Sequence, residues 1–599
     1  MKRTLIRSKY ILAAVAVAGG LFFFNACSKS FLERDPQGSL TGENVSSKDG
    51  IDALLVGAYA ALDGQQQDVA AIGTGGPWEA APSNWIYGSV AGGDAHKGSD
   101  ATDQPPISLI ATGQFDASNG FFNTKWKVLF EGVVRTNIIL SLLPNVKDMS
   151  DGQKTQVQAE ARFLRGHYYF ELKKMFGKVP WVDETQITDY KQPNNTDIWP
   201  KIEEDFKFAY ENLPPAQSQV GRANKWAAAA YLAKTYVYQK KWTDAKPLFD
   251  LITTQGVTAK GVKYALTARF EDNFDSETKN NSESVFAIQM SANNGTGQIS
   301  NGNQGEMLNF PYNSPFGCCG FYQPTQDLVN SYRTDANGLP YLDDFNDHAV
   351  KSDMKILSTA PFTPDAGTLD PRLDWTVGRR GIPYLDWGNH PGRSWVRDQD
   401  YAGPYAPKKN VYWQYNQDKY KDANSWAPGS AINLVLIRYS DVLLMAAETE
   451  AELTNLDAAQ VYVNMVRTRA ASPQTIVYKY IDDTKPMGGF TTTPAANYLV
   501  KNYPAGAFAT MGKDGALKAI RFERKLELAM EGQRFFDIVR WGTAPAEMTR
   551  FFAYESKITT DLNGGKFVVG RNEHYPIPQR QIDLSFKNGA KTLEQNDGY

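Results

Sequence analysis

Residues 227–253 read AAAAYLAKTYVYQKKWTDAKPLFDLIT, a run of small and aromatic residues with a regular spacing. Four of its residues recur at offsets of 3, 9 and 4, namely Ala233, Tyr236, Ala245 and Phe249. Small residues let two antiparallel helices approach closely, and aromatic residues at these offsets fill the gap between the helices. The stretch therefore predicts a pair of antiparallel, tightly packed helices.

The same offsets return near the other end of the chain. In IRYSDVLLMAAETEAELTNLDAAQVYVNMVRTRA, residues 437–470, they fall on Ala447, Glu450, Ala459 and Val463, with weaker matches at the second and fourth positions. These are the offsets of the tetratricopeptide repeat. Helix-like patterns also cover residues 156–176, 197–213 and 516–530. The sequence thus predicts a mainly α-helical scaffold of tetratricopeptide-like helix pairs.

Two other regions are rich in Gly, Pro, Asn, Asp and aromatic residues, a composition that favours loops and short strands. The longer one spans about residues 280–430 and contains FPYNSPFGCCGFYQPTQDLVNSY. The shorter one, residues 73–118, contains GGDAHKGSD. We expect both regions to contribute to one face, and ligand binding to take place there.

The N-terminus has the features of an export signal. Four basic residues precede an apolar run from Ile11 to Phe24, which is too short to span a bilayer. Cys27 follows Ala26 directly, so residues 1–26 are predicted to be a lipoprotein signal peptide and Cys27 the lipidated residue that anchors the protein to a membrane. The alternative is an ordinary cleaved signal followed by an incidental cysteine.

Charge argues against a nucleic-acid partner. The 599 residues include 63 Lys and Arg against 66 Asp and Glu, and the net charge of −3 becomes about −7 once the signal peptide is removed. A nucleic-acid-binding protein would show a basic patch or a high pI. No long linker divides the chain, so we expect one body over residues 27–599. Its helical scaffold would comprise residues 27–280 and 431–599, and its loop-rich, ligand-binding insertion residues 281–430.

Three cysteines are present, and lipidation of Cys27 leaves only the adjacent Cys318 and Cys319. In an oxidising compartment these two either pair with each other or stay reduced. A vicinal disulfide would form a rigid apolar knob between Gly317 and Gly320, whereas free thiols would simply pack in a loop.

No enzyme motif was found in the sequence. The five histidines are scattered, without zinc-site spacing, and there is no nucleophile elbow, Walker loop or dinucleotide fingerprint. We therefore predict a protein that is not an enzyme and has no cofactor. Oxygen donors at Asp335, Asn337, Asp343 and Asp344 could hold calcium, but they lack the full spacing of an EF-hand, and a plain turn is favoured.

Several segments resemble the SusD/RagB family of outer-membrane lipoproteins, the surface nutrient-binding partners of TonB-dependent transporters in Bacteroidetes. The segments are CSKSFLERDPQGSLT (27–41), IRYSDVLLMAAETEAEL (437–453), AIRFERKLELAMEGQRFFDIVRWG (519–542), HYPIPQRQIDLSF (574–586) and LEQNDGY (593–599). The resemblance extends over nearly the whole chain. It implies tetratricopeptide helix pairs with a less regular portion that carries much of the ligand-binding face.

The resemblance also implies a role and a location. Such a lipoprotein sits on the outer membrane facing the cell exterior, captures an oligosaccharide or a peptide, and closes as a lid over a SusC-like transporter. Glycan capture is the leading hypothesis, peptide capture by the same architecture is the second, and a tetratricopeptide scaffold that binds only proteins is the third. The charged helix RFERKLELAMEG (521–532) is interpreted as structural, because charges three and four residues apart support a helix.

Sugar sites combine aromatic faces with a few polar side chains that hydrogen-bond hydroxyl groups. Residues of these types in the loop-like regions are the predicted ligand contacts: Trp78, Trp85, Tyr87, Asp94, His96, Tyr312, Phe316, Phe321, Tyr322 and Trp387.

Overall fold

A computed structural model describes residues 45–64, 76–295 and 302–599. The predicted signal peptide and the lipidation site Cys27 lie outside the described residues. Most of the regular structure is helical, and the strands are short and form two-stranded pairs, so the prediction of a mainly α-helical fold is confirmed. No helix of the described ranges is both long and apolar enough to cross a membrane.

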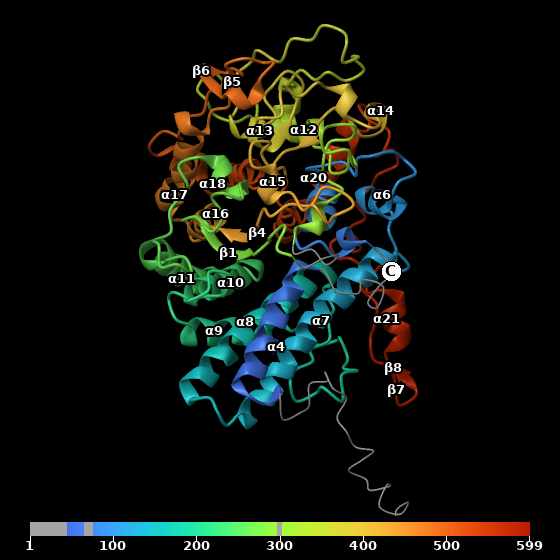
Figure 1. The fold of residues 1–599 in the computed structure, drawn as a ribbon, viewed down its shortest axis with the longest axis vertical. Helices are drawn as coiled ribbons and strands as arrows, with labels where there is room; N and C mark the ends of the chain where they lie inside the picture. Colours follow the sequence, from blue (N-terminus) through green and yellow to red (C-terminus); the bar gives the residue numbers. More distant parts are fainter. Residues whose placement is uncertain (1–44, 65–75, 296–301) are drawn as a thin grey trace, which may run out of the picture.

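The first half of the chain forms a layer of antiparallel helices, drawn in blue to green in the lower part of Figure 1. These helices are α4 (Lys48–Ala60), α7 (Gly120–Leu142), α8 (Asp151–Phe176), α9 (Trp199–Asn212), α10 (Lys225–Tyr238) and α11 (Trp242–Gln255). The helix predicted over residues 156–176 begins earlier, because Ser150 and Gln153 form a capping box.

The first predicted helix pair is present as α10 and α11. Ala233 and Ala245 have no exposed surface, and Phe249 is 1% exposed. The small side chains bring the two helices together, and the phenylalanine fills the space between them. Tyr236 is partly buried and packs at the edge of the same core. The tetratricopeptide spacing was therefore a correct guide to this part of the fold.

The second pair consists of α16 (Tyr439–Glu452) and α17 (Leu456–Ala470). Ala447, Ala459 and Val463 are fully buried, as the spacing predicts. The mismatched Glu450 forms an ion pair with Lys246 of α11 and accepts a hydrogen bond from Asn455. Its charge thus links the second helix pair to the first.

The upper part of Figure 1 contains the loop-rich region with its short helices. The short helices there are α12 (Gln326–Ser331), α13 (Arg372–Thr376), α14 (Gln399–Ala402) and α15 (Gln417–Tyr420). The strand pairs are β1 (Ser284–Ile288) with β4 (Leu434–Arg438), β2 (Val377–Gly378) with β3 (Ala406–Pro407), and β5 (Tyr478–Tyr480) with β6 (Phe490–Pro494), all antiparallel.

The C-terminal elements run through both parts. They are α18 (Ala507–Glu527), α19 (Arg534–Arg540), α20 (Ala544–Glu555), α21 (Gln579–Leu584) and the hairpin of β7 (Phe586–Lys587) and β8 (Ala590–Lys591). A short helix, α6 (Pro105–Ala111), lies in the shorter loop-like region. One hydrophobic core extends from Ile51 of α4 to Ile582 of α21 and so joins these elements.

The charged segment 521–532, which starts in α18 and continues past the end of that helix at Glu527, contributes to a buried ion network. Glu523 and Glu527 of α18 have no exposed surface. Arg372 of α13 contacts both carboxylates at 2.8 Å, and Arg467 of α17 contacts Glu523 at 2.8 Å. Glu527 also pairs with two further arginines, Arg438 and Arg469, and both of these reach Glu283, which lies directly before β1. The network therefore connects α18 to the loop-rich region.

Candidate functional site

The two loop-like regions lie against each other, as their composition predicted. Residues 95–98 form antiparallel bridges with residues 321–324. The backbone amide of His96 donates to the carbonyl of Gln323 at 2.8 Å, and that of Tyr322 donates to Lys97 at 2.9 Å. Backbone pairing therefore brings residues from opposite halves of the chain onto one face.

Seven of the ten predicted ligand contacts lie in the interior and are each less than one tenth exposed. They are Trp85, Tyr87, Asp94, His96, Phe316, Phe321 and Tyr322. Their polar atoms bond within the protein: Trp85 Nε1 donates to the carbonyl of Gly305 at 3.0 Å, and the Tyr87 hydroxyl donates to that of Glu79 at 2.6 Å. These side chains fasten the loops to the core and have little surface left for contact with a ligand.

His96 and Asp94 have unusual electrostatic environments. The His96 ring lies between the carboxylates of Asp561, at 2.9 Å, and Glu555, at 3.1 Å. Burial alone would lower the pKa of His96, but the two carboxylates outweigh it and raise the pKa to about 10. Burial raises the pKa of Asp94 to about 6, although its carboxylate accepts a hydrogen bond from the Met530 amide. Both groups are structural here.

Trp78 and Trp426 form an edge-to-face pair on the surface, with ring centroids 6.3 Å apart. Trp426 is 70% exposed, whereas Trp78 is partly buried and donates its indole N–H to Gln104 Oε1 at 3.3 Å. Gln104 accordingly holds the Trp78 ring in place, while the Trp426 ring projects into solvent.

Tyr312 extends the same surface. It is 36% exposed, and the guanidinium of Arg397 lies 5.3 Å above its ring. Arg397 in turn contacts Asp103 at 2.8 Å and Asp100 at 2.7 Å, and Asp103 directly precedes Gln104. A continuous series of contacts thus joins Tyr312 to Trp78. We call the surface of Trp78, Tyr312 and Trp426, with Arg397 and Gln104, the aromatic face.

The loop of residues 310–320 presents Tyr312 to solvent. The sulfur atoms of Cys318 and Cys319 form a vicinal disulfide, and Cys319 is 6% exposed. A Cβ placed on Gly320 would approach the Cβ of Tyr312 to 3.0 Å, and the φ of Gly320 is +78°. Only glycine fits this position readily, because both the backbone conformation and the close approach disfavour a side chain.

Behind the aromatic face lies a second hydrophobic cluster, which includes Phe310, Phe316, Tyr384 and Tyr412. The predicted contact Trp387 packs on Phe316 at a centroid distance of 4.6 Å and donates its N–H to the Tyr412 carbonyl at 2.9 Å. Trp387 is partly buried, so it supports the loops and retains some accessible surface.

Sequence reasoning missed Trp426, Arg397 and Gln104. For Trp426 a signal existed: the residue lies in NSWAPGS, where only polar residues, Ala, Pro and Gly surround it. A tryptophan with no apolar partners nearby in a turn-rich segment is a good candidate for exposure. Arg397 and Gln104 have no such signal, because only tertiary contacts bring them to the aromatic rings.

The calcium alternative receives no support from the arrangement of side chains. Asp335 Oδ1 accepts hydrogen bonds from the amides of Asn337 and Leu339, both at 2.8 Å, as in a turn, and Asp343 pairs with Lys518. Within residues 45–64, 76–295 and 302–599, no three His, Cys, Asp or Glu side chains are grouped to hold a metal ion.

Comparisons with known proteins show which families the chain resembles. Residues 282–599, over half of its length, match the SusD family, and residues 30–237 match a family described as "Starch-binding associating with outer membrane". The SusD-like protein P25 of Formosa agariphila is 27% identical over 430 residues, which cover 70% of this chain and 69% of that protein.

Two solved structures share the fold. A SusD superfamily protein from Bacteroides vulgatus has a TM-score of 0.64 and 21% identity, covering 92% of this chain and 99% of that one. Surface glycan-binding protein A from Bacteroides thetaiotaomicron, in complex with laminarihexaose, has a TM-score of 0.60 and 19% identity, with coverage of 92% and 99%. The solved structures share the fold, and the family match over residues 282–599 shows that the chain belongs to the SusD family.

Proposed function

We propose that this protein binds an oligosaccharide or polysaccharide at the cell surface and delivers it to a SusC-like TonB-dependent transporter of the outer membrane. A lipid on Cys27 would hold it on the membrane, facing the exterior. The protein would act as a lid over the transporter, opening and closing through modest, reversible contacts, and would carry out no chemistry on the ligand and need no cofactor.

The observation that carries the proposal is the aromatic face. Indole and phenol rings stack on the CH-rich faces of sugar rings, and neighbouring polar groups hydrogen-bond the hydroxyls. Trp426 and Tyr312 present such rings to solvent, and Arg397 and Gln104 lie beside them. Apolar rings that are exposed together, as in the Trp78–Trp426 pair, mark binding sites more often than single exposed residues do.

The comparisons favour a glycan as the ligand class. One matched family is described as starch-binding, and the structural neighbours include a protein described as a laminarin-binding SusD-like protein. Association with the outer membrane is supported by the description of the same family. Delivery to a transporter is the part of the proposal that the family resemblance alone supports.

Trp426→Ala should weaken glycan binding at least about tenfold, because a central aromatic ring typically contributes 1.4 kcal/mol or more to affinity. The measurement is calorimetry of the mature chain carrying Cys27→Ser, titrated with starch, laminarin and other soluble glycans and with a mixed peptide library. The fold should be unaffected, since the Trp426 side chain is largely in solvent.

Tyr190→Ala is the matched control: Tyr190 is 62% exposed and lies between α8 and α9, away from the aromatic face. The glycan affinity of this variant should stay within about twofold of that of the unsubstituted chain. Binding of peptides alone would replace glycan by peptide as the ligand class. Glycan binding that survives Trp426→Ala unchanged would show that the aromatic face is not the site.

A further inference from the structure

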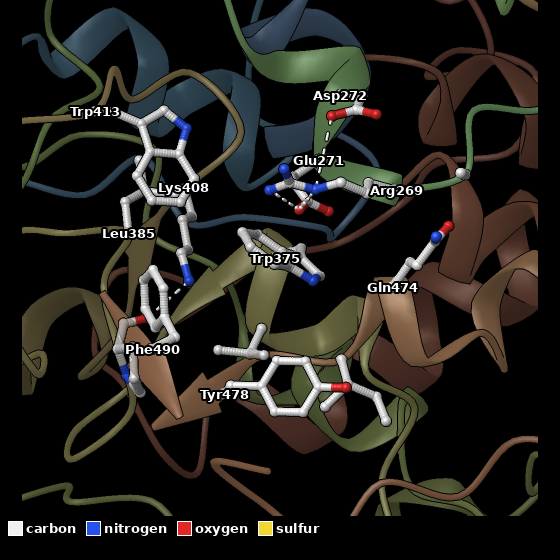
Figure 2. A pocket seen from close by; sticks show the side chains of 14 residues that line it. Arg269, Glu271, Asp272, Trp375, Leu385, Lys408, Trp413, Gln474, Tyr478 and Phe490 are labelled. Carbon is white, nitrogen blue, oxygen red and sulfur yellow. Dashed lines mark hydrogen bonds and ion pairs between the residues drawn. The ribbon is translucent and has the colours of Figure 1, made fainter. Parts of the chain in front are cut away.

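A pocket of about 320 Å³ lies apart from the residues of the aromatic face. It opens between the 3₁₀ helix Phe270–Phe274, the chain around residues 383–413 and the β5–β6 hairpin. Figure 2 shows Trp413, Lys408 and Phe490 on one side, with Arg269 and Glu271 across from them and Trp375 between the two groups. This volume suits one or two sugar rings, at the small end of ligand pockets.

The walls of this pocket are aromatic and held in place. Trp375 is 8% exposed and donates its N–H to the Thr475 carbonyl at 2.6 Å. Phe490 stacks on Tyr480 with centroids 5.1 Å apart, and it meets the Trp413 ring edge-on at 6.4 Å. Fixed rings lose little conformational freedom when a ligand arrives, so the pocket is preorganised.

Glu271 provides an unfilled polar position in the pocket. The residue is 5% exposed, and its Oε1 accepts a hydrogen bond from Arg269 Nε at 2.5 Å. Its Oε2 is buried and has no hydrogen-bond partner among the described residues. A buried carboxylate oxygen without a partner costs about 1–3 kcal/mol, and a ligand hydroxyl at this point would remove that cost.

Charge in the lining indicates the kind of ligand. Two acidic residues, Glu271 and Asp272, are matched by two basic ones, Arg269 and Lys408. The Lys408 ammonium is already bonded to the carbonyls of Asp374 and Pro383. The pocket therefore has no net charge to attract an ion, while it offers both donors and acceptors.

We propose that this pocket binds a neutral sugar ring, at a site separate from the aromatic face. Aromatic walls would cover the CH faces of the ring, and the free oxygen of Glu271 would bond a hydroxyl. The proposal does not depend on glycan binding at the aromatic face, because no residue that lines the pocket belongs to that face.

The test is saturation-transfer NMR and tryptophan fluorescence titration of the mature chain, Cys27→Ser, with glucose, galactose, mannose and N-acetylglucosamine. We expect saturable binding of at least one sugar in the millimolar range. Glu271→Gln, which keeps the shape of the side chain, should weaken it at least about tenfold, because the amide replaces one acceptor by a donor. Phe490→Ala should weaken sugar binding by a similar factor, because it removes one aromatic wall of the pocket.

Phe586→Ala is the matched control, since Phe586 also lies on an exposed two-stranded hairpin and is 52% exposed against 38% for Phe490. Phe586→Ala should leave the affinity for these sugars unchanged. Trp426→Ala should also leave it unchanged, which would separate this site from the aromatic face. Glucosamine is included as a cationic probe. The proposal is overturned if none of the four sugars binds, if only glucosamine binds, or if both pocket variants bind as the unsubstituted chain does.

Discussion

Glu527→Ala should lower the free energy of unfolding by about 3–5 kcal/mol, the usual cost of removing one partner from a buried ion network. Glu527 is fully buried and pairs with Arg372, Arg438 and Arg469. Truncation leaves three buried guanidinium groups with less counter-charge and leaves a void in the core. Urea unfolding followed by circular dichroism measures the change through its midpoint and slope.

Glu204→Ala is the control for this variant. Glu204 pairs with Arg162 at 3.2 Å, but its side chain is 59% exposed, so its loss should cost less than about 1 kcal/mol. Glu527→Gln separates charge from volume: it keeps the shape and should still destabilise strongly if charge is the reason. Equal stability of the Glu527 and Glu204 variants would contradict the view that the network holds α18 to the loop-rich region.

The helical scaffold was predictable because its signal is local. Ala233, Ala245 and Phe249 are spaced by the geometry of two packed helices, and that spacing is visible without any knowledge of the rest of the chain. The structural role of Glu523 and Glu527 was predictable for the same reason. Their partners were not, since Arg372 comes from a helix 151 residues before Glu523 in the sequence.

The face was predictable, and so were two of its rings, Trp78 and Tyr312, but its most exposed ring, Trp426, was not. The composition of residues 73–118 and of about 280–430 predicted loops and short strands, and backbone bridges do join residues 95–98 to residues 321–324. In irregular loops no period of 2 or 3.6 residues separates inward from outward side chains. Trp85 and Trp78 therefore looked alike, although only tertiary packing makes the first a core residue and leaves the second at the surface.

His96 should make the protein less stable as the pH rises above neutrality. Its folded pKa of about 10 lies above the value near 6.5 of the unfolded chain. A raised pKa gives stability that is fully present below about pH 6.5 and is lost progressively up to pH 10. Full loss amounts to several kcal/mol, at about 1.4 kcal/mol for each pH unit. The cause is local, because only the protonated ring donates to both Asp561 and Glu555.

The observable is the difference in unfolding free energy between the unsubstituted chain and His96→Gln, followed by urea unfolding from pH 6.5 to 9. Other groups also titrate in this range. Burial lowers the pKa of Lys408 and that of Lys409 to about 8, and a lowered lysine pKa makes the folded state more stable as the pH rises. Their contribution is common to both proteins and cancels in the difference. That difference should shrink by about 1.4 kcal/mol for each pH unit between pH 7 and 9. A difference that does not change with pH would mean that His96 is neutral in the folded protein, and that a neutral hydrogen bond holds the loop of residues 95–98 to α20.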